Sequence, residues 1–179
     1  NSKNNNLTIL VTGGAGFIGS HLVDKLLSLG HKVKVLDNLA NGKEANMSEA
    51  SKNPNFNFIK GDILHPETCD LATKDIDIVY HLACLGVRHS IHSPFENHRV
   101  NAEGSLNMLE TKKKNNVKRF FYISTSEIYG DIKVFPIDEA GIPMPKTVYG
   151  ASKLAGENYA YSYFTCYGMD TTILRIFNN

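Results

Sequence analysis

The sequence predicts an α/β protein whose strands form one doubly wound parallel sheet with helices on both faces. Strand-like apolar runs and helical patterns alternate along the whole chain, and such alternation implies right-handed crossovers between parallel strands. Six strand-like runs are present, the number that completes a sheet of this kind. A glycine cluster follows the first run, where the first helical pattern begins, and this placement is typical of the Rossmann fold.

Each expected element is a periodic apolar run bounded by glycine, proline or polar residues. We expect strands at residues 7–12, 32–37, 56–60, 76–82, 118–124 and 171–176. We expect helices near residues 17–29, 43–51, 95–115 and 147–167, with a short one after Pro66. Asp131–Lys146 contains three prolines, and a proline disfavours helix at the residue before it. This segment should be a surface loop near the functional site.

Composition limits the class of protein. A chain of 179 residues, 42% of them hydrophobic, fits one domain with a sizeable core. The formal net charge of +1 gives no global field that would recruit nucleic acid or membranes. No apolar run approaches the length of a membrane span. Residues 1–6 are polar and predict a disordered lead or a cloning remnant rather than a signal peptide.

The three cysteines indicate the compartment. Cys69, Cys84 and Cys166 are widely spaced and odd in number, so they form neither a zinc pattern nor a disulfide framework. A reducing compartment is favoured, and we expect a soluble cytoplasmic protein without a metal site.

The glycine cluster predicts a phosphate-binding turn. Gly14, Gly16 and Gly19 satisfy G-x-G-x-x-G, and Gly13, Gly16 and Gly19 satisfy the wider T-G-x-x-G-x-x-G. A tight turn needs a residue without Cβ, a pyrophosphate must approach bare backbone, and the new helix must pack closely on the strand. The free N–H groups of the helix that opens at Phe17 and Ile18 then hold the phosphates.

Asp37 selects the cofactor. It closes the second strand-like run, 18 residues beyond Gly19, near the roughly 20 expected for a carboxylate that binds the adenosine ribose hydroxyls. A carboxylate repels a 2′-phosphate, and neither Asn38 nor Leu39 supplies an arginine, so NAD is favoured over NADP. The alternative is a solvated aspartate at a strand end. With the glycine turn, Asp37 predicts that residues 7–179 form a dinucleotide-binding domain.

Tyr149 and Lys153 predict catalysis. Spaced i and i+4, they project from one face of a helix. An ammonium beside a phenol favours the phenolate and should lower the Tyr149 pKa from near 10 toward working pH. Such a phenolate removes a proton from a substrate hydroxyl while hydride leaves the carbon. The alternative is two amphipathic residues on a helix surface.

Hydroxyl groups gather at the end of the fifth strand-like run, in Ser124-Thr125-Ser126-Glu127. The carboxyl ends of strands in an open α/β sheet face the ligand crevice. A hydroxyl placed there hydrogen-bonds the reacting oxygen of a substrate and shares its proton with the tyrosine.

Together these motifs resemble the extended short-chain dehydrogenase/reductases that modify nucleotide sugars. The similar features cover essentially all of residues 7–178, in the family's order. They are the Thr12-to-Gly19 fingerprint, Asp37-Asn38, Gly61-Asp62-Ile63, His81-Leu82-Ala83, Asn101, the hydroxyl-rich strand end, Tyr149 with Lys153, and Arg175-Ile-Phe-Asn178. The resemblance implies an NAD-dependent enzyme acting on a UDP-, dTDP- or GDP-linked sugar.

The resemblance also implies roles for single residues. For the cofactor, Asp62 and Ile63 contact the adenine, Leu82, Ala83 and Cys84 line its path, Lys153 holds the nicotinamide ribose, and Asn38, Asn101 and Ser124 belong to the same site. For the substrate, Thr125 matches the catalytic Ser/Thr position, and Ser126 and Asn178 match positions at the sugar nucleotide. Simpler interpretations exist: Asp62 as a turn former, Cys84 as a small core residue, Asn101 as a helix-surface amide.

Two departures from the family pattern leave the reaction open. Family members usually continue past the Arg-x-x-Asn segment into a smaller substrate-binding domain, so we expect this chain to be the cofactor half of a longer enzyme. Glu127 resembles the acid of the dehydratases and decarboxylases, whereas the surroundings of Tyr149 resemble the epimerases. We favour a 4-epimerase. A 4,6-dehydratase, a decarboxylase of a nucleotide-linked uronic acid and a non-catalytic NAD-binding module are the alternatives.

The two longest predicted helices indicate a homodimer. Tyr159, Tyr163 and Tyr167 recur at i, i+4 and i+8 and form an aromatic stripe on helix 147–167. The resemblance implies that this helix and helix 95–115 pair with the same two helices of a second subunit. Core packing of the stripe against the sheet is the competing interpretation.

Overall fold

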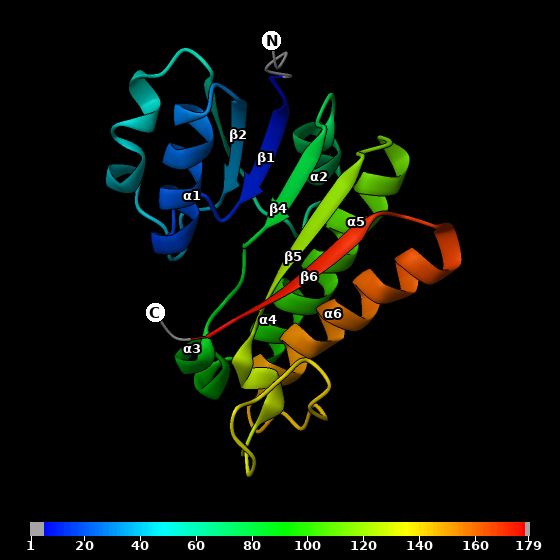
Figure 1. Cartoon of the computed structure of the whole chain (residues 1–179). Coiled ribbons are helices and arrows are strands. Elements are labelled where there is room, and N and C mark those ends of the chain that lie inside the picture. Colours follow the sequence, from blue (N-terminus) through cyan, green and yellow to red (C-terminus); the bar gives the residue numbers. More distant parts are fainter. Residues whose placement is uncertain (1–5, 178–179) are drawn as a thin grey trace.

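A computed structural model describes residues 6–177 and shows a six-stranded, all-parallel sheet in the order β3-β2-β1-β4-β5-β6 (Figure 1). The strands are β1 (Thr8–Thr12), β2 (Lys32–Asp37), β3 (Phe56–Lys60), β4 (Ile78–His81), β5 (Arg119–Thr125) and β6 (Thr171–Ile176). The strand order reverses between β1 and β4. The predicted doubly wound parallel sheet is confirmed.

Helices connect the strands. They are α1 (Phe17–Ser28), α2 (Pro66–Thr73), α3 (Val87–His92), α4 (Pro94–His98), α5 (Gly104–Lys114) and α6 (Val148–Tyr167). A π-helical segment, η3 (Arg99–Glu103), joins α4 to α5, and three short 3₁₀ turns are η1 (Glu44–Met47), η2 (Ala50–Lys52) and η4 (Ser126–Tyr129). In residues 6–177, no helix is long and apolar enough to cross a membrane.

The expected helix at 43–51 is wrong. Its place is taken by η1 and η2, because the segment is held to the glycine turn by tertiary hydrogen bonds. The Lys43 N–H and the Asn46 side-chain amide both donate to the Ala15 carbonyl, at 3.0 and 2.8 Å. The expected helix at 95–115 is present as a continuous run, but the π segment interrupts its regular pitch.

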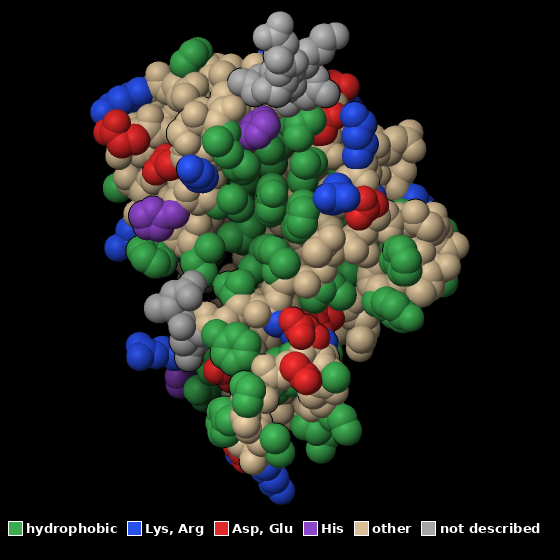
Figure 2. Space-filling model, in the orientation of Figure 1, with side chains coloured by type: hydrophobic (Ala, Val, Ile, Leu, Met, Phe, Trp, Pro, Cys, Tyr) green, Lys and Arg blue, Asp and Glu red, His purple; other side chains and the backbone are tan. Residues whose placement is uncertain are grey.

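The two faces of the sheet carry separate cores, as alternation along β1 requires. Ile9 and Val11 pack with α1, η1 and η2, whereas Leu10 packs with α2, α5 and α6. The face that α1 covers is covered only in part. Tyr80 and Phe121 stack there with ring centroids 4.7 Å apart, and Figure 2 shows hydrophobic side chains gathered over the middle of the sheet.

A buried hydrogen-bond chain crosses from β1 to α5. The Thr12 hydroxyl accepts from the N–H groups of Leu82 and Ala83, so its own proton goes to Nδ1 of His81, 2.6 Å away. His81 therefore carries its proton on Nε2 and donates to the Ser105 hydroxyl at 3.0 Å. Ser105 in turn donates to the Asn101 carbonyl. Complete burial, with a smaller contribution from nearby Lys153, lowers the His81 pKa to about 3.

The folded chain therefore excludes a proton that the unfolded chain binds below the ordinary His81 pKa of 6.5. We expect the free energy of unfolding to fall as the pH decreases from 6.5 toward 3, with His81 contributing up to about 1.4 kcal/mol per pH unit. His81→Gln keeps an amide that accepts from Thr12 or donates to Ser105 without titrating. Urea unfolding at pH 7.5, 6.5, 5.5 and 4.5 should show a shallower pH slope for the variant. Equal slopes would assign the acid sensitivity to other groups.

Candidate active site

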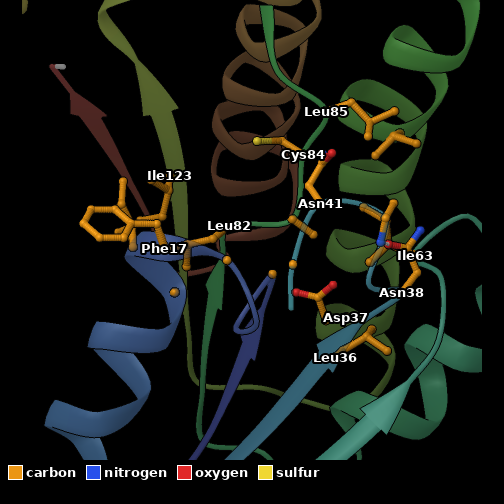
Figure 3. A pocket seen from close by; sticks show the side chains of 18 of the residues that line it. Phe17, Leu36, Asp37, Asn38, Asn41, Ile63, Leu82, Cys84, Leu85 and Ile123 are labelled. Carbon is orange, nitrogen blue, oxygen red and sulfur yellow. Dashed lines mark hydrogen bonds between the residues drawn. The ribbon is translucent and has the colours of Figure 1, made fainter. Parts of the chain in front are cut away.

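A cavity of about 360 Å³ opens at the carboxyl ends of the strands (Figure 3). Its walls bring together residues from the β1–α1 turn, the segments after β2, β3 and β4, the end of β5, and α6. The lining includes most of the residues predicted for the cofactor: Gly13, Gly16, Phe17, Ile18, Gly19, Asp37, Asn38, Asp62, Ile63, Leu82, Ala83, Cys84, Ser124, Tyr149 and Lys153.

The glycine turn is too tight for side chains. Gly13 has φ of +71°, and a Cβ there would lie 2.8 Å from the Ala83 nitrogen. A Cβ on Gly19 would lie 2.2 Å from the Gly13 carbonyl oxygen. Gly16 caps α1 in an extended conformation and leaves the first N–H groups of that helix at the cavity. The cradle therefore exposes backbone donors to a ligand phosphate, as the spacing predicts.

Asp37 ties the end of β2 to this turn. One carboxylate oxygen accepts from the Ala15 N–H at 3.0 Å, and the other accepts from the Leu39 N–H at 2.8 Å. Asp62 similarly accepts from the Leu64 N–H and from the Asn38 amide, which closes the wall beyond Asp37. Both carboxylates are held by backbone donors before any ligand binds, and both still border the cavity.

The sequence does not assign every lining residue to the site. Two of the others, Gly61 and Ile176, belong to motifs named above without a role of their own. The rest lie in no motif and are Leu36, Ala40, Asn41, Gly42, Leu85, Val100 and Ile123. The segment after β2 carried a usable signal, because residues that follow a strand's carboxyl end border the crevice. A larger residue at position 42 would clash with the glycine turn, because its Cβ would lie 2.7 Å from the Ala15 Cβ. Figure 3 shows Ile123 near Phe17 and Leu82, on the side of the cavity opposite Asp37 and Asn38.

One end of the cavity, here called the reactive end, is lined by Ile123 and Ser124 of β5 and by Tyr149 and Lys153 of α6. Lys153 is only 3% exposed, and its Nζ donates to the Ile123 carbonyl at 2.6 Å. Ser124 borders the cavity with a buried hydroxyl that has no hydrogen-bond partner among residues 6–177. An unpaired buried hydroxyl is costly, so Ser124 fits a polar group of a bound ligand.

The pKa of Tyr149 departs from the sequence-based expectation. Burial raises it above 10, nearby Cys84 raises it further, and the Lys153 ammonium and the Thr125 hydroxyl lower it without reversing the shift. The prediction of a net lowered pKa is wrong for the chain alone, because desolvation of the phenolate outweighs the lysine. The contribution of Lys153 taken alone lowers the Tyr149 pKa, as predicted.

Asn101 lies behind the cavity wall, 1% exposed, rather than in it. Its amide donates to the Leu85 carbonyl and to the Ser152 hydroxyl, and its oxygen accepts from the Leu85 N–H. Ser152 donates in turn to the Tyr149 carbonyl. Asn101 thus fixes the 82–85 segment and α6 relative to each other, and both of these border the cavity.

The remaining predicted residues lie around the reactive end. Thr125 is nearly buried and caps η4, accepting from the Glu127 N–H at 3.2 Å. Ser126 and Glu127 are half-buried on η4, beyond the residues that line the cavity. Asn178 lies outside the described residues.

Comparison with known proteins shows the family to which the chain belongs. The model of the NAD dependent epimerase/dehydratase family matches residues 9–179, and the chain belongs to that family. NAD is its cofactor.

Three relatives show the range of its activities. A putative UDP-glucose 4-epimerase of Methanocaldococcus jannaschii is 38% identical, over 95% of this chain and 55% of its own length. UDP-glucuronic acid decarboxylase 1 of Arabidopsis thaliana is 39% identical, over 96% and 40%. The crystal structure of a dTDP-glucose 4,6-dehydratase from Streptomyces venezuelae with NAD bound superposes with a TM-score of 0.91 at 33% identity, over 94% and 55%. The chain thus spans about half the length of these proteins.

We predict that Gly19→Ala weakens NAD binding to the 179-residue chain at least tenfold, about 1.4 kcal/mol, because the new methyl group must push the Gly13 carbonyl out of the turn. Calorimetric titration with NAD measures the effect. Gly86→Ala is the matched control, since a Cβ there meets nothing within 4 Å and its φ of −82° suits alanine. Equal affinities for the two variants would remove the glycine turn from the binding site.

Proposed function

We propose that this chain is the cofactor-binding part of a nucleotide-sugar 4-epimerase that oxidises the sugar at C4 and reduces it again from the opposite face. One observation carries the proposal. Tyr149 and Lys153 stand in the wall of the same cavity as the glycine turn and Asp37, so a proton acceptor and a dinucleotide site share one space. A protein that only binds NAD has no need for a phenol at that place.

The glycine turn and Asp37 would hold NAD in this cavity, and NAD would supply the hydride acceptor and a positive charge that favours the phenolate together with Lys153. Tyr149 then takes the proton of the C4 hydroxyl. Thr125, in contact with Tyr149, orients the same oxygen. Lys153, fixed by the Ile123 carbonyl, keeps its charge beside the phenolate. In the return step, Tyr149 gives the proton back to the C4 oxygen.

The choice among the family's reactions depends on Glu127. The epimerase proposal is supported by the epimerase among the relatives. A dehydratase or decarboxylase is the second candidate, because Glu127 lies on η4 two residues from Thr125 and the other relatives carry those activities. The substrate proposed in each case is a UDP-, dTDP- or GDP-linked sugar.

We propose that the enzyme is cytoplasmic, because a reducing compartment keeps thiols unpaired. Cys69, Cys84 and Cys166 are all free thiols, and Cys69 is buried.

Two substitutions in the full-length protein test the proposal. Tyr149→Phe removes the proton acceptor and should lower turnover of a UDP-hexose at least 100-fold with NAD affinity within twofold of the unaltered protein.

Glu127→Gln should leave most epimerase turnover intact, measured by product chromatography. If instead Glu127→Gln stops product formation while NADH absorbance accumulates, the protein is a dehydratase. Undiminished turnover by Tyr149→Phe contradicts any of these mechanisms.

We also propose a homodimer through α4–α5 and α6, although not through the predicted stripe. Tyr159 and Tyr163 pack into the core, which leaves Tyr167 as the exposed member. The Tyr163 hydroxyl donates to Glu110, and Lys113 lies 4.3 Å from the centroid of the Tyr167 ring. The stripe therefore joins α6 to α5 within one subunit.

Another aromatic surface remains on α6. Tyr161, Phe164 and Tyr167 are 52–62% exposed, and Tyr167 adjoins Lys113 of α5. Exposed aromatic anchors of this kind are typical of interface centres. They support pairing of α5 and α6 with the same helices of a second copy, which would bury on the order of 1,600 Å².

Phe164→Glu should convert the dimer to a monomer at about 50 μM, because it places a carboxylate in an apolar interface. Light scattering measures the mass. Leu71→Glu is the control, since Leu71 on α2 is 56% exposed, similar to Phe164 at 52%. A monomeric mass for the unaltered chain at the same concentration rejects the dimer.

A further inference from the structure

The Lys153 ammonium is buried without an anionic partner. Among residues 6–177, no carboxylate lies within ion-pair distance of its Nζ, and the Ile123 carbonyl is its one hydrogen-bond acceptor. The nearest acid along α6, Glu157, is instead paired with Arg175 at 2.9 Å. A charge removed from water needs compensation, so another group must stabilise this ammonium.

Tyr122, on the strand that faces α6, stabilises the Lys153 ammonium. It lies on β5, is fully buried, and its ring centroid is 4.7 Å from the Lys153 Nζ, within the range of a cation–π interaction. The same side chain also holds the backbone of Lys153, since its hydroxyl donates to the Lys153 carbonyl at 3.0 Å. Tyr122 thus contacts both the charged end and the backbone of the lysine.

The opposing helix is shaped to admit this ring. A Cβ on Gly156 would lie 2.1 Å from the Tyr122 hydroxyl oxygen and 2.4 Å from the ring carbon that carries it. Gly156 follows Lys153 by three residues on α6, so glycine stands on the turn against which the phenol rests. The close approach of β5 to α6 therefore depends on Tyr122 and Gly156 together.

The groups around Lys153 leave it as the single positive charge in this cluster. His81 on β4 lies beside the Tyr122 ring, with centroids 6.0 Å apart, and its lowered pKa keeps it neutral. Burial raises the pKa of both Tyr122 and Tyr149, so both phenols are neutral at neutral pH. Cys84, after β4, lies near enough to interact with the lysine.

We propose that Tyr122 is a positioning residue whose ring face and hydroxyl keep Lys153 charged and fixed at the reactive end of the cavity. The proposal rests on the proposed function, in which Lys153 stabilises the Tyr149 phenolate. An aliphatic residue would fill the same space under α6 but offers no negative π face. Burial alone lowers the Lys153 pKa, whereas the ring face 4.7 Å from its Nζ and the Ile123 carbonyl both favour the ammonium. Lys153 consequently stays an ammonium throughout the working pH range.

Fluorination of the ring tests this without changing its shape. We would replace Tyr122 by phenylalanine, which keeps the π face and loses the hydroxyl, and by 3,4,5-trifluorophenylalanine, which weakens the π face. The ε-carbon NMR signal of Lys153 in the ¹³C-lysine-labelled 179-residue chain, assigned by its loss in Lys153→Met, reports between pH 7 and 11 whether the lysine is an ammonium. We expect the unaltered chain and Tyr122→Phe to keep the ammonium signal up to pH 11, because the Lys153 pKa is raised above its ordinary 10.5. The trifluorinated ring should bring the midpoint of the Lys153 titration below pH 11.

Phe120 provides the matched control. It is fully buried on β5, and its ring centroid lies 5.8 Å from that of His81 at the same 41° tilt as Tyr122. No lysine or arginine of residues 6–177 lies over the Phe120 ring. Trifluorination at Phe120 should leave the Lys153 pKa unchanged. An unchanged pKa on fluorination at position 122, or an equal shift from position 120, overturns the proposal.

A drop caused by Tyr122→Phe alone, without a further drop on fluorination, also overturns the part assigned to the ring and leaves only the hydroxyl. Because neither NAD nor substrate is present, the result is independent of the enzyme assays with Tyr149→Phe. Folding of each variant is checked by its amide NMR spectrum.

Discussion

The hydroxyl of Thr12 holds the sheet together where its strand order reverses. At that point β1 and β4 lie side by side while their connections leave in opposite directions, which opens the crevice. Thr12 accepts the N–H groups of Leu82 and Ala83 after β4 and gives its proton to His81. The segment that turns away from the sheet is thereby kept close to the glycine turn. Gly13 lacks a Cβ for that reason, since Ala83 occupies the space.

The helix α6 is fixed by three separate contacts along its length. Near its start, Ser152 joins the amide network of Asn101. One residue on, the carbonyl of Lys153 receives the Tyr122 hydroxyl. One turn further, Glu157 forms two hydrogen bonds with Arg175 of β6, at 2.9 and 3.2 Å. These three contacts hold α6 against rotation about its own axis, and Tyr149 and Lys153 project from that helix.

The Arg175 contact also reaches the loop at 131–146. Its guanidinium donates to the Tyr129 hydroxyl at 2.7 Å and to the Glu139 carbonyl at 3.0 Å, and Tyr129 donates to the Asp138 carbonyl. A charge-assisted cluster thus links the proline-containing loop to the helix that carries the reactive groups. The loop contributes no residue to the cavity lining, and Arg175 of β6 is what ties it to α6.

The sequence by itself determined the doubly wound parallel sheet, the glycine turn after its first strand, and the pair Tyr149 and Lys153 that borders the same cavity. Glycine spacing, an acid at a strand end and an i, i+4 pair each depend on local geometry, which the chain carries in its own order. Only the tertiary structure decided that Asn101 lies behind the wall, that Tyr159 and Tyr163 pack inward, and that residues 44–52 form 3₁₀ turns. It also decided the direction of the Tyr149 pKa, because burial and the charges around a group come from segments far apart in sequence. Spacing along one element cannot report the desolvation that neighbouring elements impose.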